Sequence, residues 1–153
     1  MSHSIKAEDL GSLIGQDLEP SSWLEITQQR INDFADATND HQFIHVDPEK
    51  AAKTPFRGPI AHGFLTLSLV PFLTAEKSKN IDGLLMGVNY GSDKVRFLQP
   101  VPVGSRIRAQ QRLLEVTQKR PGQWLTKTLV TIEIEGAEKP ALVAEFLAMY
   151  FVK

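Results

Sequence analysis

Residues 61–76 read AHGFLTLSLVPFLTAE, and this stretch decides the fold. Large apolar side chains surround the segment on nearly every side: Phe64, Leu65, Leu67, Leu69, Val70, Phe72 and Leu73. A helix that is apolar all round is a buried helix. Because Pro71 removes one backbone hydrogen bond, we expect it to kink this helix or to end its first part.

Shorter helices are predicted before this segment. Residues 6–16 favour a short helix, because their leucine and isoleucine side chains share one face. Thr27 is placed to cap a helix over 28–38, which carries a single apolar stripe. Asp47, followed by proline, is a strong signal for the start of another short helix.

The pattern changes to strands from residue 84 onward. Residues 105–117 and 123–135 alternate between apolar and polar side chains, as strands with one buried face do. The last run, 141–152, is apolar on both faces and reads as a central strand. Helices followed by four strands in hairpin connection indicate an α+β protein, with an antiparallel sheet and its helices on one face.

Size and composition narrow the class of protein. The 153 residues fit a single domain, residues 1–153. The chain has no cysteine, which excludes disulfides and thiolate metal sites and suits a reducing cytoplasm. Seventeen basic against eighteen acidic side chains give no reason to expect a nucleic-acid partner. No apolar run is long enough to span a membrane, and the first residues lack the order of a signal peptide.

Polar and apolar residues alternate unusually in TNDHQFIHVDP, residues 38–48. A carboxylate, Asp40, lies five residues before a histidine, His45. Such a mixture indicates a partly desolvated polar cluster, in which titratable groups are poised for proton transfer. An acid and a base of this kind suit the addition of water to an activated double bond. The alternative is that Asp40 only ends the preceding helix and His45 is a structural loop residue.

A metal site is the other chemical interpretation of this stretch. His41 and His45, with Asp47 or His62, offer ligands that zinc accepts. Their spacing would suit one face of a helix, but the cap at Asp47 and the proline after it predict that 41–47 is not helical. No third ligand stands at a recognisable spacing. We therefore expect neither a metal nor a cofactor.

The step from His62 to Gly63 opens the apolar helix. The first amide groups of a helix are free and carry partial positive charge, and glycine lets a ligand approach the backbone closely. The Gly63 N–H is thus a candidate donor to a carbonyl oxygen that gains charge, unless the glycine only allows a tight turn. Ser68, further along the helix, is a candidate pocket residue or a hydroxyl bonded to a preceding carbonyl.

These motifs together resemble a known family. The stretch 31–73 is similar to the MaoC-like (R)-specific enoyl-CoA hydratases, in which Asp-x4-His is followed by a His-Gly that opens the central helix. The segment MGVNYGSDKVRFLQPVPVGSRIRA, residues 86–109, resembles the strand and turn that follow. The resemblance runs over about 20–152, and residues 26–51 and 88–91 look most like the branch that includes nodulation protein N.

The resemblance implies a hot-dog fold, in which an antiparallel sheet wraps around a long central helix. It implies reversible hydration of a 2-enoyl-CoA, with Asp40 and His45 as the catalytic pair and one water between them. It also implies that the Gly63 N–H holds the thioester oxygen, that Ser68 lies in the pocket, and that coenzyme A enters only as part of the acyl-CoA substrate. Candidates for its phosphates are basic residues that also suit an ordinary surface: Arg57, Lys94, Arg96, Arg106 and Arg108.

Two other functions remain open on the sequence. One is an acyl-CoA thioesterase on the same fold, although thioesterases of this fold generally lack the Asp-x4-His pair. The other is a non-catalytic acyl-binding subunit, against which the intact pair argues. In each case an exposed sheet edge predicts a homodimer, since such edges are usually covered by pairing of subunits.

Overall fold

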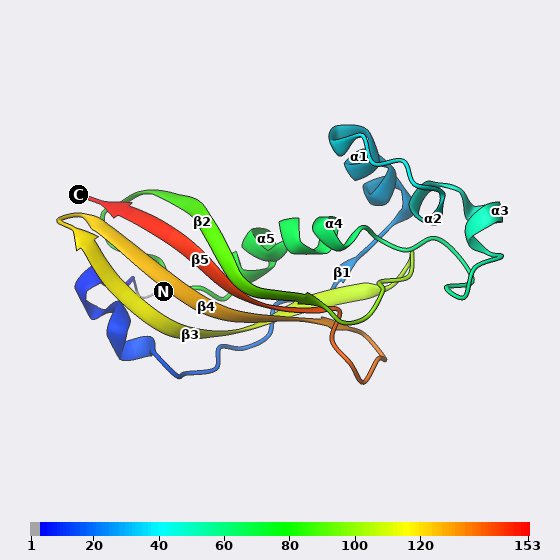
Figure 1. The fold of residues 1–153 in the computed structure, drawn as a ribbon. Helices are drawn as coiled ribbons and strands as arrows, with labels where there is room; N and C mark the ends of the chain where they lie inside the picture. The colour runs from blue at the N-terminus through cyan, green and yellow to red at the C-terminus, as the bar shows by residue number, and fades with distance from the viewer. Residues whose placement is uncertain (1–3) are drawn as a thin grey trace.

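A computed structural model describes residues 4–153 as one curved antiparallel sheet with helices inside and beyond it (Figure 1). The first three residues of the expected domain lie outside this range. The strands are β1 (Leu24–Glu25), β2 (Leu84–Phe97), β3 (Arg106–Arg120), β4 (Gln123–Ile134) and β5 (Leu142–Val152). The helices are the 3₁₀ helix η1 (Ala7–Leu13), α1 (Gln28–Thr38), α2 (Phe43–Val46), α3 (Pro48–Ala51), α4 (Gly63–Ser68) and α5 (Val70–Ala75).

The sheet has the strand order β1-β3-β4-β5-β2. The prediction that the last strand is central is confirmed, because β5 pairs with β4 on one side and with β2 on the other. The prediction of a hairpin between β2 and β3 is wrong. The connection after β2 does not fold back, because its backbone bonds instead to the chain entering α4: Ala61 N–H donates to Val101, and Val103 N–H to Pro59.

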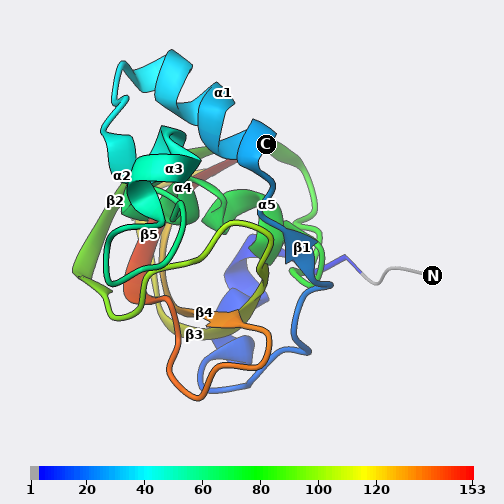
Figure 2. The same cartoon turned by 90° about the vertical axis from the view of Figure 1, so that its right-hand side faces the viewer.

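The central helix lies inside the curve of the sheet and is broken once (Figure 2). Leu69 separates α4 from α5, and Pro71 stands in the first turn of α5, as expected from the sequence. One face of the two helices forms the core with the sheet through Leu65, Leu69, Val70, Leu73, Ile107, Val130, Ile132 and Leu142, all buried. The α+β class and the hot-dog arrangement are thereby confirmed.

The central helix is not buried on every side. Phe64 is 68% exposed and Phe72 is 65% exposed, so the prediction of burial all round is wrong for these two side chains. They lie on the side of α4 and α5 that turns away from the sheet core. Within residues 4–153 this side is covered only in part, by the edge contact of the Phe64 ring with Phe97, and the apolar pattern therefore indicates a surface as well as a core.

The short helices follow their capping signals. Thr27 accepts a hydrogen bond from the Arg30 amide at the start of α1, and Asp47 accepts one from Lys50 at the start of α3. The prediction that 41–47 is not helical is wrong, because α2 forms one turn there. Asp47 closes that turn, since its own N–H donates to Phe43. Among the described residues no helix is both long and apolar enough to cross a membrane.

Candidate active site

Asp40 is placed by the end of helix α1. Asn39 adopts a left-handed conformation, with φ 58°, and turns the chain out of the helix. The amide of Asp40 still bonds to the Ala35 carbonyl, 3.2 Å away, so the residue directly after the cap is held. Its side chain is exposed in the single chain and accepts a long bond of 3.4 Å from the Gln42 amide. The carboxylate is therefore positioned but open to solvent.

His45 lies on the single turn of α2 and is only 6% exposed. Its Nδ1 lies 2.7 Å from the carbonyl oxygen of Ile60. Because a carbonyl can only accept, Nδ1 carries the hydrogen, and in the neutral ring Nε2 keeps a free lone pair. The Gln28 side chain donates to the carbonyl of His45 at 2.8 Å, which ties α2 to α1. His45 thus presents a fixed ring with one unprotonated nitrogen.

Burial lowers the pKa of His45, because the charged ring loses its hydration. The neighbouring His62 also lowers this pKa, whereas the bond to the Ile60 carbonyl and the nearby Asp40 carboxylate raise it. Burial is the largest of these effects. The ring is consequently neutral at pH 7 and can accept a proton at Nε2.

His62 completes a cluster with these two residues. It is 3% exposed, precedes the first residue of α4, and its Nε2 lies 2.9 Å from the carbonyl oxygen of Asp40. Its ring stacks on that of His45, with centroids 3.8 Å apart and an angle of 23° between the planes. Side-chain atoms of Asp40, His45 and His62 all lie within 4.8 Å of one another. Side chains from the end of α1, from α2 and from the start of α4 therefore lie close together.

The stacked rings do not suit a shared metal ion. Zinc binds a histidine nitrogen in the plane of the ring at about 2.0–2.1 Å. Possible ligand atoms of Asp40, His45 and His62 lie within 4.8 Å of one another, but the two rings stack with centroids 3.8 Å apart, so their in-plane lone pairs do not converge well on one ion. The other proposed ligand, His41, is exposed and bonds instead to Asp36 at 2.8 Å. The absence of a metal remains a prediction, now with a geometric reason.

A cavity of about 250 Å³ lies beside His45 and reaches the start of α4. It is lined by His45, Ile60, Ala61, Gly63, Thr66, Phe97, Gln99, Pro100, Val101 and Ala141. A side chain at position 63 would place its Cβ 3.0 Å from the Phe97 ring, so glycine is needed for this close approach. The first amide of α4 has no intrahelical acceptor. The cavity thus combines a free backbone donor with the imidazole base.

Ser68 does not line this cavity. It is the last residue of α4, exposed, and its hydroxyl donates to the Phe64 carbonyl at 2.6 Å. The structure brings Asp40, His45 and Gly63 towards one another and leaves Ser68 outside the group. Its role in binding substrate stays a prediction.

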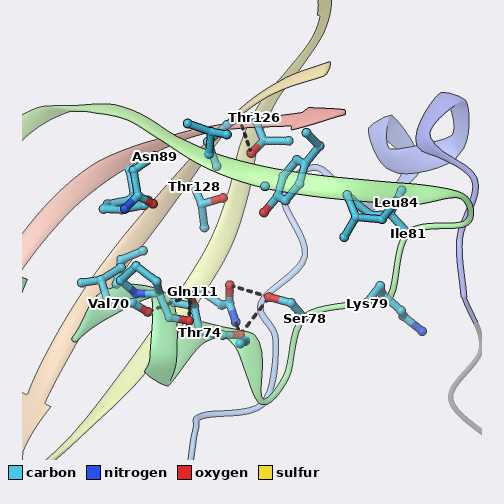
Figure 3. A pocket seen from close by; sticks show the side chains of 18 of the residues that line it. Val70, Thr74, Ser78, Lys79, Ile81, Leu84, Asn89, Gln111, Thr126 and Thr128 are labelled. Atoms are coloured by element: carbon cyan, nitrogen blue, oxygen red, sulfur yellow. Dashed lines mark hydrogen bonds between the residues drawn. The ribbon is translucent and has the colours of Figure 1, made fainter. Parts of the chain in front are cut away.

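A larger cavity, of about 330 Å³, opens between α5 and the sheet (Figure 3). Its lining mixes apolar and polar side chains, and Gln111 there donates to the Thr74 carbonyl at 2.8 Å and lies 3.5 Å from the Ser78 hydroxyl. Neither Asp40 nor His45 lines it. This cavity is larger than the one beside His45, but the smaller one contains the imidazole and the first residue of α4, and it is therefore the candidate active site.

Comparison with known proteins identifies the family of the chain. The model of the MaoC like domain matches residues 9–135. The chain belongs to the MaoC-like family. The chain is 48% identical to 3-hydroxyacyl-thioester dehydratase Z of Mycobacterium tuberculosis strain H37Rv, over 93% of each chain. It is 47% identical to nodulation protein N of Rhizobium meliloti, over 96% of this chain and 92% of the relative. The branch predicted from the sequence is thereby confirmed.

The fold is likewise that of the family. A solved structure described as a monoamine oxidase regulatory protein from Archaeoglobus superposes with a TM-score of 0.81 at 26% identity. The superposition covers 100% of this chain and 99% of the other. The family of the chain is thus shown, and the roles of Asp40, His45 and the start of α4 in its candidate site remain predictions.

Sequence reasoning missed part of this MaoC-like site. His62 was considered only as a metal ligand, although it contacts both members of the predicted pair. The cavity is also lined by Phe97, Gln99 and Val101, which follow the start of α4 by more than thirty residues in the chain. The sequence signal for these residues is the turn with prolines at positions 100 and 102. That signal does not predict that the backbone of the turn pairs with the chain entering α4.

The state of His45 can be measured without an assay of activity. In ¹⁵N histidine NMR we expect the Nδ1–H tautomer and a titration midpoint below the ordinary value of about 6.5, because burial opposes the charged ring. His45→Gln should remove this signal and so assign it. A midpoint at or above the ordinary value, or the Nε2–H tautomer, contradicts the geometry described here.

Proposed function

We propose that this protein is an (R)-specific 2-enoyl-CoA hydratase, which interconverts trans-2-enoyl-CoA and (R)-3-hydroxyacyl-CoA. The observation that carries the proposal is the grouping of Asp40, His45 and the start of α4. The unprotonated Nε2 of His45 and the first amide of α4 belong to residues that line the cavity of about 250 Å³. The Asp40 carboxylate is outside this lining, but an oxygen of it lies within 4.8 Å of a His45 ring nitrogen. The 48% identity to a 3-hydroxyacyl-thioester dehydratase supports the same reaction in the reverse direction.

The two side chains suit a single water molecule. A water has two hydrogens to donate, and Asp40 and His45 offer one acceptor each on neighbouring sides of the cluster. In this proposal Asp40 accepts the proton as the water oxygen forms a bond to C3. His45 orients the water through Nε2. Holding the water in line with the alkene contributes as much as the proton transfer itself.

The proton balance follows from the tautomer of His45. Its Nδ1–H is engaged with Ile60, and Nε2 carries no proton in the neutral ring. The pair therefore starts with no proton to give. The proton that reaches C2 is the one removed from the water, passed on through Asp40 and His45. One O–H bond breaks, C3–O and C2–H bonds form, and the site returns to its first state.

The thioester oxygen is proposed to accept a hydrogen bond from the Gly63 N–H. Negative charge moves onto this oxygen as water adds to C3, and a preformed backbone donor lowers the barrier by stabilising that charge. The absence of a side chain at Gly63, beside the Phe97 ring, leaves room for the thioester. The cavity beside His45 is where the reacting carbons would lie.

The carrier of the acyl group is proposed to be coenzyme A. Three of the five basic candidates are occupied by glutamates in ion pairs: Lys94, Arg106 and Arg108. Arg57 and Arg96 form no ion pair with any residue in the range 4–153. These two therefore remain the candidates for the phosphates.

The active form is proposed to be a cytoplasmic homodimer. Strand β2 lies at the edge of the sheet, with one side unpaired. Large apolar side chains are exposed on β2 and directly after it: Leu84, Leu85, Met86, Val88, Tyr90, Phe97 and Leu98. An edge of this length and character is normally covered by another strand. A second copy pairing along β2 would also cover the exposed Phe64 and Phe72.

The direct test of this function uses crotonyl-CoA. Mixing it with the protein should remove the absorbance of the conjugated enoyl thioester without releasing free thiol. Release of thiol at the same rate would indicate a thioesterase. No change in either signal, with binding retained, would indicate an acyl-binding subunit.

Asp40→Asn should lower kcat by about two to four orders of magnitude, the usual contribution of a general base. His45→Gln should have a similar effect, and the double variant should be little worse than either, because both residues act on one water. His41→Gln is the matched control, since His41 is exposed and bonds to Asp36. Additive losses, or near-normal turnover of Asp40→Asn, would refute the shared water.

The product should be the (R)-3-hydroxyacyl thioester. The pair holds its water on one side of the alkene and the start of α4 fixes the carbonyl, so only one face of C3 is open to attack. The (R) configuration at C3 is expected from the resemblance to the (R)-specific hydratases. Coupling to dehydrogenases specific for each enantiomer measures it, and a signal with the (S)-specific enzyme alone would overturn the assignment.

A further inference from the structure

We propose that His62 is a positioning residue for the catalytic pair, holding Asp40 through its backbone and His45 through its ring. The inference rests on the proposed function and deepens it. It starts from a buried histidine that the water-adding step does not use. His62 is 3% exposed and contacts both members of the pair.

The contact to Asp40 adds a second hold on the chain where it leaves α1. Asp40 lies directly after a left-handed cap, where the chain leaves α1, and its side chain is exposed. The His62 Nε2–H donates to its carbonyl at 2.9 Å, because a carbonyl can only accept. This bond joins residues 22 positions apart and sets the distance between Asp40 and the start of α4.

The contact to His45 restricts the plane of its ring. The two rings stack at 3.8 Å, and Phe34 lies on His62 with centroids 4.9 Å apart. The Ile60 carbonyl holds His45 at a single atom and leaves rotation about that bond open. A flat neighbour limits this rotation, and so keeps Nε2 directed at the position of the water.

The second ring nitrogen of His62 indicates that the hydrogen bond to Asp40 is not the only contribution of this ring. Its Nδ1 is buried and has no hydrogen-bond partner among the described residues. An unpaired buried polar atom is unfavourable. An amide side chain could donate to the Asp40 carbonyl, and an apolar ring could stack on His45. Neither would bury an unpaired ring nitrogen. The imidazole supplies both the donor and the flat face, whereas glutamine lacks the ring and phenylalanine lacks the donor.

Two variants separate these contributions. His62→Gln keeps a donor near the Asp40 carbonyl but loses the ring. His62→Phe keeps the ring and removes both the donor and the unpaired nitrogen, so it should fold with a melting temperature close to that of the wild type. His41→Phe, at an exposed histidine bonded to Asp36, is the matched control.

With crotonyl-CoA, His62→Phe should lose about 10- to 100-fold in kcat, the scale expected when a reacting group is misplaced by around 1 Å. Its KM should change little, because the proposed donor to the thioester is the backbone N–H of Gly63, which a change of the His62 side chain leaves in place. His62→Gln should recover part of the loss, and His41→Phe should match the wild type. Wild-type kcat in His62→Phe, or a loss confined to KM, would overturn the proposal.

A second readout does not depend on activity. The Gln42 amide donates to the Asp40 carboxylate, so its NMR signal and its hydrogen exchange report the position of that side chain. We expect faster exchange at Gln42 in His62→Phe but not in His62→Gln or His41→Phe. Unchanged exchange in His62→Phe would refute the positioning role even if the wild type proved to have no hydratase activity.

Discussion

The site depends on the backbone of Ile60. Its N–H donates to the Ile44 carbonyl at 3.0 Å, and its own carbonyl accepts from His45 Nδ1 at 2.7 Å. The same residue forms a bridge with Pro102, in the connection after β2. One residue therefore joins the turn that carries His45, the chain that enters α4 and the wall of the cavity. It also determines which nitrogen of His45 is free, and the chemistry follows from that.

The motifs that carry local information were predicted well. Thr27 and Asp47 cap helices because their side chains bond to amides three residues on, and Pro71 breaks the central helix because it lacks an N–H. Each of these outcomes depends on neighbours in the sequence, which a pattern can show.

The features that failed depend on distant contacts. The turn α2 is only four residues long, and its tie to α1 comes from Gln28, far back in the chain. The missing hairpin between β2 and β3 reflects bonds from the connection to the entry of α4. His62 was not assigned a role because its stacking on His45 requires two helices to be placed first. A periodicity cannot report such contacts.

The same limit applies to the exposed apolar surface. The pattern of α4 and α5 predicted burial all round, whereas Phe64 and Phe72 are exposed and adjoin an unpaired edge strand. An apolar pattern predicts that a side chain is shielded from water in the functional protein. It does not predict whether the same chain or a second chain provides the shielding.

The central claim is that one water adds to C3 of an enoyl thioester. Its most direct test is mass spectrometry of the products formed from crotonyl-CoA in H₂¹⁸O. The account predicts one ¹⁸O atom in the C3 hydroxyl of an intact coenzyme A thioester. Recovery of ¹⁸O in the carboxylate of free crotonate, with an unlabelled C3, would contradict it.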